Sequence, residues 1–159
     1  MRIFLLILFC LGSSELFSQS APAEDTSVTM MTIKSIPEFV DSLREKLLTD
    51  TSKFNADHIV NTSKGKRNMN SYSPLLFINI RFQYKLDIVP AGEVIQFVDE
   101  ILVADKIERI SILDQPKSVK IFGPNGINGE ILIQLKPGAE VDFNIAGFKP
   151  DRNVGNNFY

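Results

Sequence analysis

The feature that most constrains this chain is a stretch in its second half, residues 106–136, where two short alternating runs flank a segment rich in glycine. Apolar residues fall at every second position on both sides, a period typical of β-strands with one buried face. Pro116 ends the first run, because proline cannot donate a hydrogen bond to a central ladder. Gly123, Gly126 and Gly129 then follow at intervals of three. Since glycine adopts positive φ without a steric penalty, the stretch predicts two strands joined by tight turns.

The other predicted strands rest on the same period of two. Alternation over residues 74–85 predicts one strand, which would place Ile80 on its buried face. Shorter runs at 28–34 and 141–145 predict two more strands. The segment 49–73 is polar and poorly periodic, so we interpret it as a connection.

Two segments show helical spacing of apolar residues, 36–48 and 93–104. Ser35 and Glu38 fit a capping box at the start of the first helix. Strands and helices together predict a single α+β domain, in which a small mixed β-sheet of about four to five strands packs with two helices.

The first twenty residues have the layout of a secretory signal peptide. Arg2 precedes an apolar run over residues 3–12, and small residues stand three and one positions before a cut ahead of Ala21. The apolar run is far below the ~20 residues that a membrane-spanning helix needs. An N-terminal anchor or a buried helix is the alternative. Cleavage would remove Cys10, the only cysteine, and with it any disulfide or thiolate metal site.

Charge and composition exclude several classes of function. A formal charge of -2 gives no general reason to expect nucleic acid as a partner. His58 is the only histidine and has no cysteine to share a metal with, so we expect no metal site and no cofactor. Lys64, Lys66 and Arg67 are interpreted as part of a solvated connection, with contact to phosphate or anionic lipid as the alternative.

The glycine segment itself invites a phosphate-binding interpretation, which its sequence does not support. Residues 123–129 read GPNGING, which is neither G-x-G-x-x-G nor a Walker loop ending in G-K-[ST]. A strand is expected after it, whereas phosphate loops lead into the N-terminus of a helix. We therefore expect no nucleotide site.

The region from about residue 73 to 136 resembles the plug domain of TonB-dependent outer-membrane receptors, in the form common among Bacteroidetes. In that family an I-E-S-I-E-V-L strand is followed by a short helical turn and then by Y-G-x-x-G-x-N-G-V-I-x-I. The matching parts of this chain are Ile107–Leu113, Lys117–Val119, Phe122–Gly129 and Ile131–Ile133, preceded by a Pro74–Ile78 strand. The departures are Glu130, where an apolar residue is usual, Leu135, where threonine is usual, and Asn79–Arg81, which replace an Asp-Gly turn.

The resemblance implies a plug fold and an exported location, in the periplasm or associated with the outer membrane. Transport is not carried over, because the residues after Lys149 do not supply the ~10-residue membrane strands of a receptor barrel. We accordingly divide the chain into a signal peptide, an N-terminal segment with one amphipathic helix, a plug-like domain and a polar tail, at residues 1–20, 21–72, 73–149 and 150–159.

The expected function is a non-enzymatic binding module that contacts an envelope protein or a small carbohydrate or peptide ligand. Loops on rigid scaffolds perform such recognition, so we place the site at the 123–129 turn and the 61–70 loop. The glycines would shape the turn, while Asn125 and Asn128 would bind the partner or satisfy the turn's own backbone. The alternatives are an accessory subunit of an envelope assembly, a receptor remnant and a small secreted hydrolase.

Overall fold

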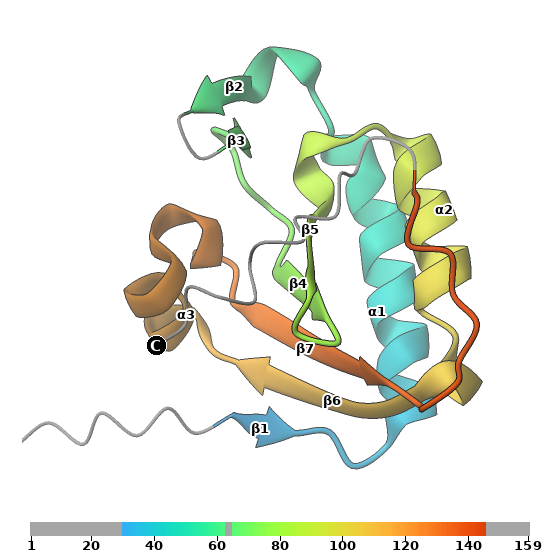
Figure 1. Ribbon diagram of the computed structural model, residues 1–159. Coiled ribbons are helices and arrows are strands. Elements are labelled where there is room, and N and C mark those ends of the chain that lie inside the picture. The colour runs from blue at the N-terminus through green and yellow to red at the C-terminus, as the bar shows by residue number, and fades with distance from the viewer. Residues whose placement is uncertain (1–29, 63–64, 146–159) are drawn as a thin grey trace, which may run out of the picture.

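The computed structural model describes residues 30–62 and 65–145 (Figure 1). The predicted signal peptide, the polar tail and the first two residues of the strand expected at 28–34 lie outside the described residues.

Five strands form one mixed sheet, and the chain adopts the predicted α+β class. The sheet order is β1-β6-β7-β4-β5. Only β4 and β7 run parallel, and the other neighbours are antiparallel. The strands are β1 (Met31–Thr32), β4 (Leu75–Ile78), β5 (Phe82–Lys85), β6 (Ile107–Leu113) and β7 (Glu130–Leu135).

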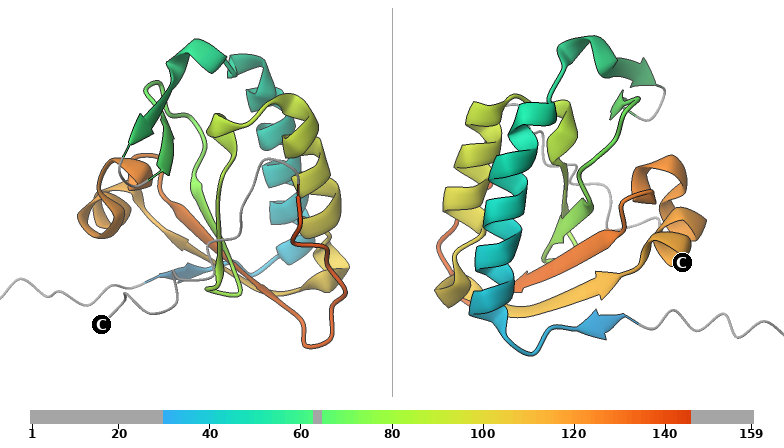
Figure 2. Two further views of the ribbon diagram at one scale, coloured as in Figure 1. Left: turned by 45° about the horizontal axis from the view of Figure 1, so that its top comes forward. Right: turned by 180° about the vertical axis from the view of Figure 1, so that it is seen from behind.

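Two helices cover one face of this sheet. α1 (Ile36–Asp50) and α2 (Ala91–Ile101) lie side by side on that face (Figure 2). Their apolar stripes meet the alternate residues of the strands in a core, where the ring of Tyr84 packs edge-on against Phe97 at 5.0 Å. Ser35 holds the N-cap position of α1, but its side chain makes no capping bond, so the capping box is wrong in that detail.

The opposite face carries a smaller apolar layer under α3 (Gln115–Phe122). This helix begins where the first run of the glycine-rich stretch was predicted to end, and Asp114 caps it by accepting the Lys117 N–H at 3.3 Å. Because neighbouring residues of a strand point to opposite faces, Phe77 faces away from the main core. Its ring lies 5.3 Å from that of Phe122, which fixes α3 to the sheet.

The prediction of a single strand over 74–85 is wrong, because the chain reverses at Asn79 and Ile80. Both residues have positive φ, 50° and 62°. The Arg81 N–H donates to the Ile78 carbonyl at 3.1 Å and closes the turn. Ile78 pairs with Phe82 across a three-residue loop. Because paired residues face the same side of the sheet, even-numbered residues face the core in both strands, and the period of two continues through the turn. Ile80 is 57% exposed and not buried.

Two other predictions need correction. Residues 141–145 form no strand, although Ile145 is buried and Phe143 stacks on Phe82 at 4.1 Å. An extended segment buries alternate side chains whether or not its backbone pairs with another strand. The alternation over 141–145 therefore predicted a strand that does not form. The segment 49–73, predicted to be a connection, contains a hairpin of β2 (Ile59–Thr62) and β3 (Gly65–Asn68). Buried and exposed residues do not alternate along these two strands, so no period of two marks them in the sequence.

Candidate functional site

The two loops singled out in the sequence line one groove. It encloses about 530 Å³ between the β2–β3 hairpin and a second wall formed by the end of α3 and the segment that follows it. The lining residues are Thr62, Lys66 and Arg67 from the hairpin, Gln83 from β5, and Ile121, Phe122, Gly123, Pro124 and Asn125. Segments about sixty residues apart in the chain thus supply the two walls.

The glycines after α3 set the course of the second wall. Gly123 and Gly129 have φ of 60° and 77°, values that other residues rarely adopt. Gly126 has ordinary φ but no room for a side chain, since a Cβ there would lie 2.4 Å from the backbone carbonyl of Ser118. The segment therefore folds back against α3 with glycine at its closest approach.

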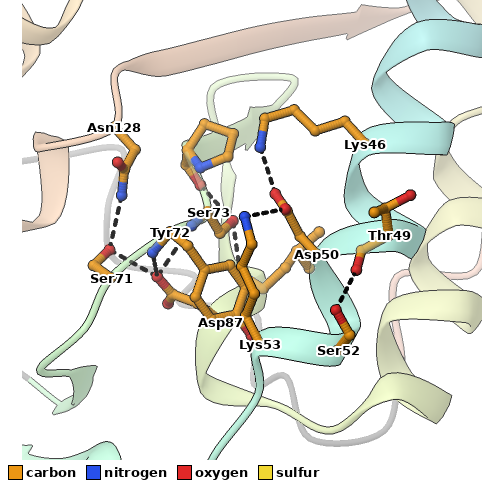
Figure 3. A network of polar contacts seen from close by, with 12 residues as sticks. Lys46, Thr49, Asp50, Ser52, Lys53, Ser71, Tyr72, Ser73, Asp87 and Asn128 are labelled. Atoms are coloured by element: carbon orange, nitrogen blue, oxygen red, sulfur yellow. Dashed lines mark hydrogen bonds and ion pairs between the residues drawn. The ribbon is translucent and has the colours of Figure 1, made fainter.

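The two asparagines proposed for binding lie in different places. Asn125 lines the groove. Asn128 does not line it; its side-chain N–H₂ donates to the Ser71 hydroxyl at 3.1 Å (Figure 3). Asn128 borders a second hollow of about 410 Å³ beside α1. Only Asn125 therefore shares a surface with the 61–70 loop.

A buried ion pair lies behind the groove, between Lys85 and Asp87. Their charged atoms, Nζ and Oδ2, are 3.7 Å apart. Asp87 is fully buried, and its Oδ2 accepts the Ser71 hydroxyl at 2.7 Å and the backbone N–H groups of Tyr72 and Ser73 at 3.0 and 3.2 Å (Figure 3). One carboxylate therefore fixes three consecutive residues of the connection that leads into β4.

Lys85 and Asp87 also contact both walls of the groove, the hairpin through the Asp87 backbone carbonyl. The Asn68 side chain at the end of the hairpin donates to the Asp87 carbonyl at 2.7 Å. The Lys85 ammonium donates to the Ser73 carbonyl and, at 3.3 Å, to the Asn125 carbonyl. Burial lowers the pKa of Lys85, and the charge of Asp87 opposes that shift. The sequence did not predict this buried pair, because a lysine and an aspartate two residues apart at the end of a strand are usually both exposed to solvent.

A second carboxylate, Asp50 at the end of α1, holds the neighbouring loop. It accepts hydrogen bonds from Lys46 and, at 2.7 Å, from Lys53 (Figure 3). Burial alone would raise the pKa of Asp50, but the hydrogen bonds and charges of the two lysines hold it below its ordinary value. Burial, together with the charges of Asp87 and Asp50, raises the pKa of Tyr72 to about 12. The Tyr72 phenol therefore stays neutral at physiological pH.

A third carboxyl group, Glu130, lies in the small layer under α3. It is 7% exposed and its Oε2 has no hydrogen-bond partner among the described residues. Glu130 stands opposite Leu75 on one side and Leu113 on the other, so it shares their apolar face. Burial raises its pKa to about 7. The sequence contains a sign of this unusual carboxyl group, because Glu130 stands where the plug-domain pattern has an apolar residue.

The described residues, 30–62 and 65–145, contain no group of three or more potential metal-binding His, Cys, Asp or Glu side chains. Within those ranges, every helix is too short or too polar to traverse a lipid bilayer.

Comparison with known proteins adds no relative: no family model, curated protein or solved structure gives a significant match to this chain.

Proposed function

We propose that this protein is a non-enzymatic, exported binding module that resembles a receptor plug domain and has no transport activity of its own. The observation that carries the proposal is the convergence of the β2–β3 hairpin and the segment after α3 on one groove. A concave site built from two connections on a fixed scaffold is typical of recognition.

The strand arrangement supports the plug-like part of the proposal. β6 and β7 are neighbours in the sheet and are joined by α3 and the glycine segment. β4 lies on the other side of β7. The resemblance leads one to expect paired strands joined in this way, with the Pro74–Ile78 strand in the same sheet.

The lining of the groove favours binding over catalysis. Its side chains offer amides, a hydroxyl, two cations and an apolar wall. Nucleophilic or acid–base catalysis needs a base within hydrogen-bond reach of the reacting group. None of the lining residues is His, Asp, Glu or Cys, and Lys66 is the one lining side chain that could serve as a base. The groove can therefore orient a ligand through its amides, hydroxyl and cations.

Asn125→Trp tests the site, because it adds bulk at a residue that lines the groove. Peptides and oligosaccharides would be titrated into ¹⁵N-labelled protein, and amide shifts would be mapped onto the groove. Ile127→Trp is the matched control, since Ile127 lies on the same segment, is exposed and does not line the groove. We expect ligand binding to be lost in Asn125→Trp and kept in Ile127→Trp. Equal binding by both variants would contradict the proposal.

Export is tested separately by expressing the full chain in a Gram-negative host. We expect the protein in the envelope fraction, with a mature N-terminus at Ala21 by N-terminal sequencing. An uncleaved protein in the cytosol would contradict that part of the proposal.

A further inference from the structure

The groove carries positive charge in a protein that is acidic overall. The chain has a formal charge of -2, yet Lys66 and Arg67 both line the groove and no Asp or Glu does. Within the part of the chain that the structure describes, neither side chain forms an ion pair. The cations that do form them are Arg44, Lys46, Lys53, Lys85 and Lys117. The two charges of the hairpin wall are therefore available to an anionic ligand.

The opposite wall, at the end of α3 and just after it, is largely apolar. Ile121 is 42% exposed, and Phe122 and Pro124 line the groove beside it. The ring of Phe122 is held by its contact with Phe77, so this wall is fixed to the sheet. A cationic wall thus faces an apolar wall across one groove.

This arrangement matches the side-chain pattern of an extended peptide. Successive side chains of a strand point to opposite sides, so carboxylates at every second position would meet the hairpin while apolar side chains meet the segment after α3. Gln83 also lines the groove and belongs to β5, the last strand in the sheet order. The backbone of an edge strand can pair with an added extended segment.

We propose that the groove binds an extended segment of a partner protein in which acidic and apolar side chains alternate. The inference rests on the proposed function, because it names the ligand class of the same groove. Arg67 contributes a planar guanidinium that can bind a carboxylate through two parallel hydrogen bonds, and Lys66 contributes a point charge. Asn125 and Gln83 supply amide groups for the peptide backbone.

The test uses fluorescently labelled hexapeptides and the full mature chain. Alternating Glu-Leu, Gln-Leu and Glu-Ser peptides would be compared by anisotropy with an oligogalacturonate and a neutral oligosaccharide. We expect the Glu-Leu peptide to bind most tightly and its affinity to fall as salt is raised, because salt screens exposed charges. Replacing Glu by Gln in the peptide should weaken binding about tenfold, as expected for loss of two exposed ion pairs that each contribute about threefold.

Variants of the protein locate the effect. Arg67→Gln and Lys66→Gln should each weaken binding of the Glu-Leu peptide about threefold, and Arg67→Lys should retain part of the affinity. Arg81→Gln is the control, because Arg81 is exposed at the tip of the β4–β5 turn and does not line the groove. Thermal melts of each variant separate loss of binding from loss of folding.

The outcomes separate this inference from the proposed function. Equal affinity for the Gln-Leu and Glu-Leu peptides, or tighter binding of either oligosaccharide, would overturn the acidic-peptide inference while the groove remains a binding site. If no probe shifts the amides of groove residues, the inference and the proposed function both fail. Binding of the Glu-Leu peptide that depends on Arg67 and not on Arg81 supports the inference.

Discussion

Replacing Asp87 by alanine tests how much one buried carboxylate contributes to the stability of the connection that leads into β4. The substitution removes the acceptor of the Ser71 hydroxyl and of the Tyr72 and Ser73 N–H groups. It also leaves the ammonium of Lys85, whose side chain is 11% exposed, without its counter-ion. Four donors that are satisfied in the native protein would then have to find water or other partners.

The expected cost is large compared with the stability of a domain this size. Breaking a buried ion pair by removing one partner costs about 3–5 kcal/mol. Hydrogen bonds to a charged group contribute about 1.5–3 kcal/mol each, but the terms overlap and do not add. We therefore expect Asp87→Ala to lower the free energy of unfolding by about 4 kcal/mol. A typical domain has only about 5–15 kcal/mol in total.

Urea denaturation followed by circular dichroism measures this loss. With a slope of about 2 kcal/mol/M, the midpoint should fall by roughly 2 M. Amide exchange provides a local readout, since the Tyr72 and Ser73 N–H groups should lose protection. The control is Asp99→Ala, because Asp99 pairs with Arg44 at 3.0 Å on the surface and should cost at most about 1 kcal/mol. A loss below about 1 kcal/mol for Asp87→Ala would show that the buried carboxylate contributes little to stability.

Three further substitutions test individual features of the fold. Burial raises the pKa of Glu130 to about 7, against 4.5 ordinarily. The contribution of Glu130 to stability should therefore be fully present below pH 4.5 and fall by about 3 kcal/mol as pH rises to 7. In Glu130→Gln, urea titrations over this range should lack this component, and an unchanged pH dependence would contradict the expectation. Ile80→Gly should raise the free energy of unfolding by about 1 kcal/mol, because Ile80 is exposed and its φ of 62° strains a β-branched residue. A lower thermal midpoint for Ile80→Gly would show that the backbone there is not strained. Gly126→Ala should cost about 1–3 kcal/mol in chemical denaturation through its contact with Ser118, whereas the control Gly92→Ala, which meets nothing within 4 Å, should not destabilise.

The sequence predicted the elements whose pattern is local. The strands β6 and β7 and the helices α1 and α2 were found because each buries one face, and burial imposes a period that is visible in the chain. The hairpin of β4 and β5 was missed for a local reason as well. Its turn uses Asn79 and Ile80, and a β-branched residue at positive φ is a choice that turn preferences do not anticipate.

For the candidate site, the sequence indicated the 61–70 and 123–129 segments, but as two separate loops. It could not show that Asn125 lies in a groove with Arg67 while Asn128 bonds to Ser71 elsewhere. That distinction depends on how the hairpin lies over the sheet, and the hairpin has no periodicity of its own.

The chain alone indicated the α+β class, the two covering helices and the two strands within residues 106–136, because local periodicity suffices for these. Between those two strands it indicated only tight turns, whereas the structure has the helix α3 ahead of the glycine segment. Only the tertiary structure decided which polar groups became buried. Lys85 and Asp87 read as surface residues in the chain, and they are a buried pair because segments far apart in sequence close over them. Burial depends on how the layers of the fold pack together. It places Lys85 where its ammonium pairs with Asp87 and also donates to the carbonyl of Asn125 in the groove.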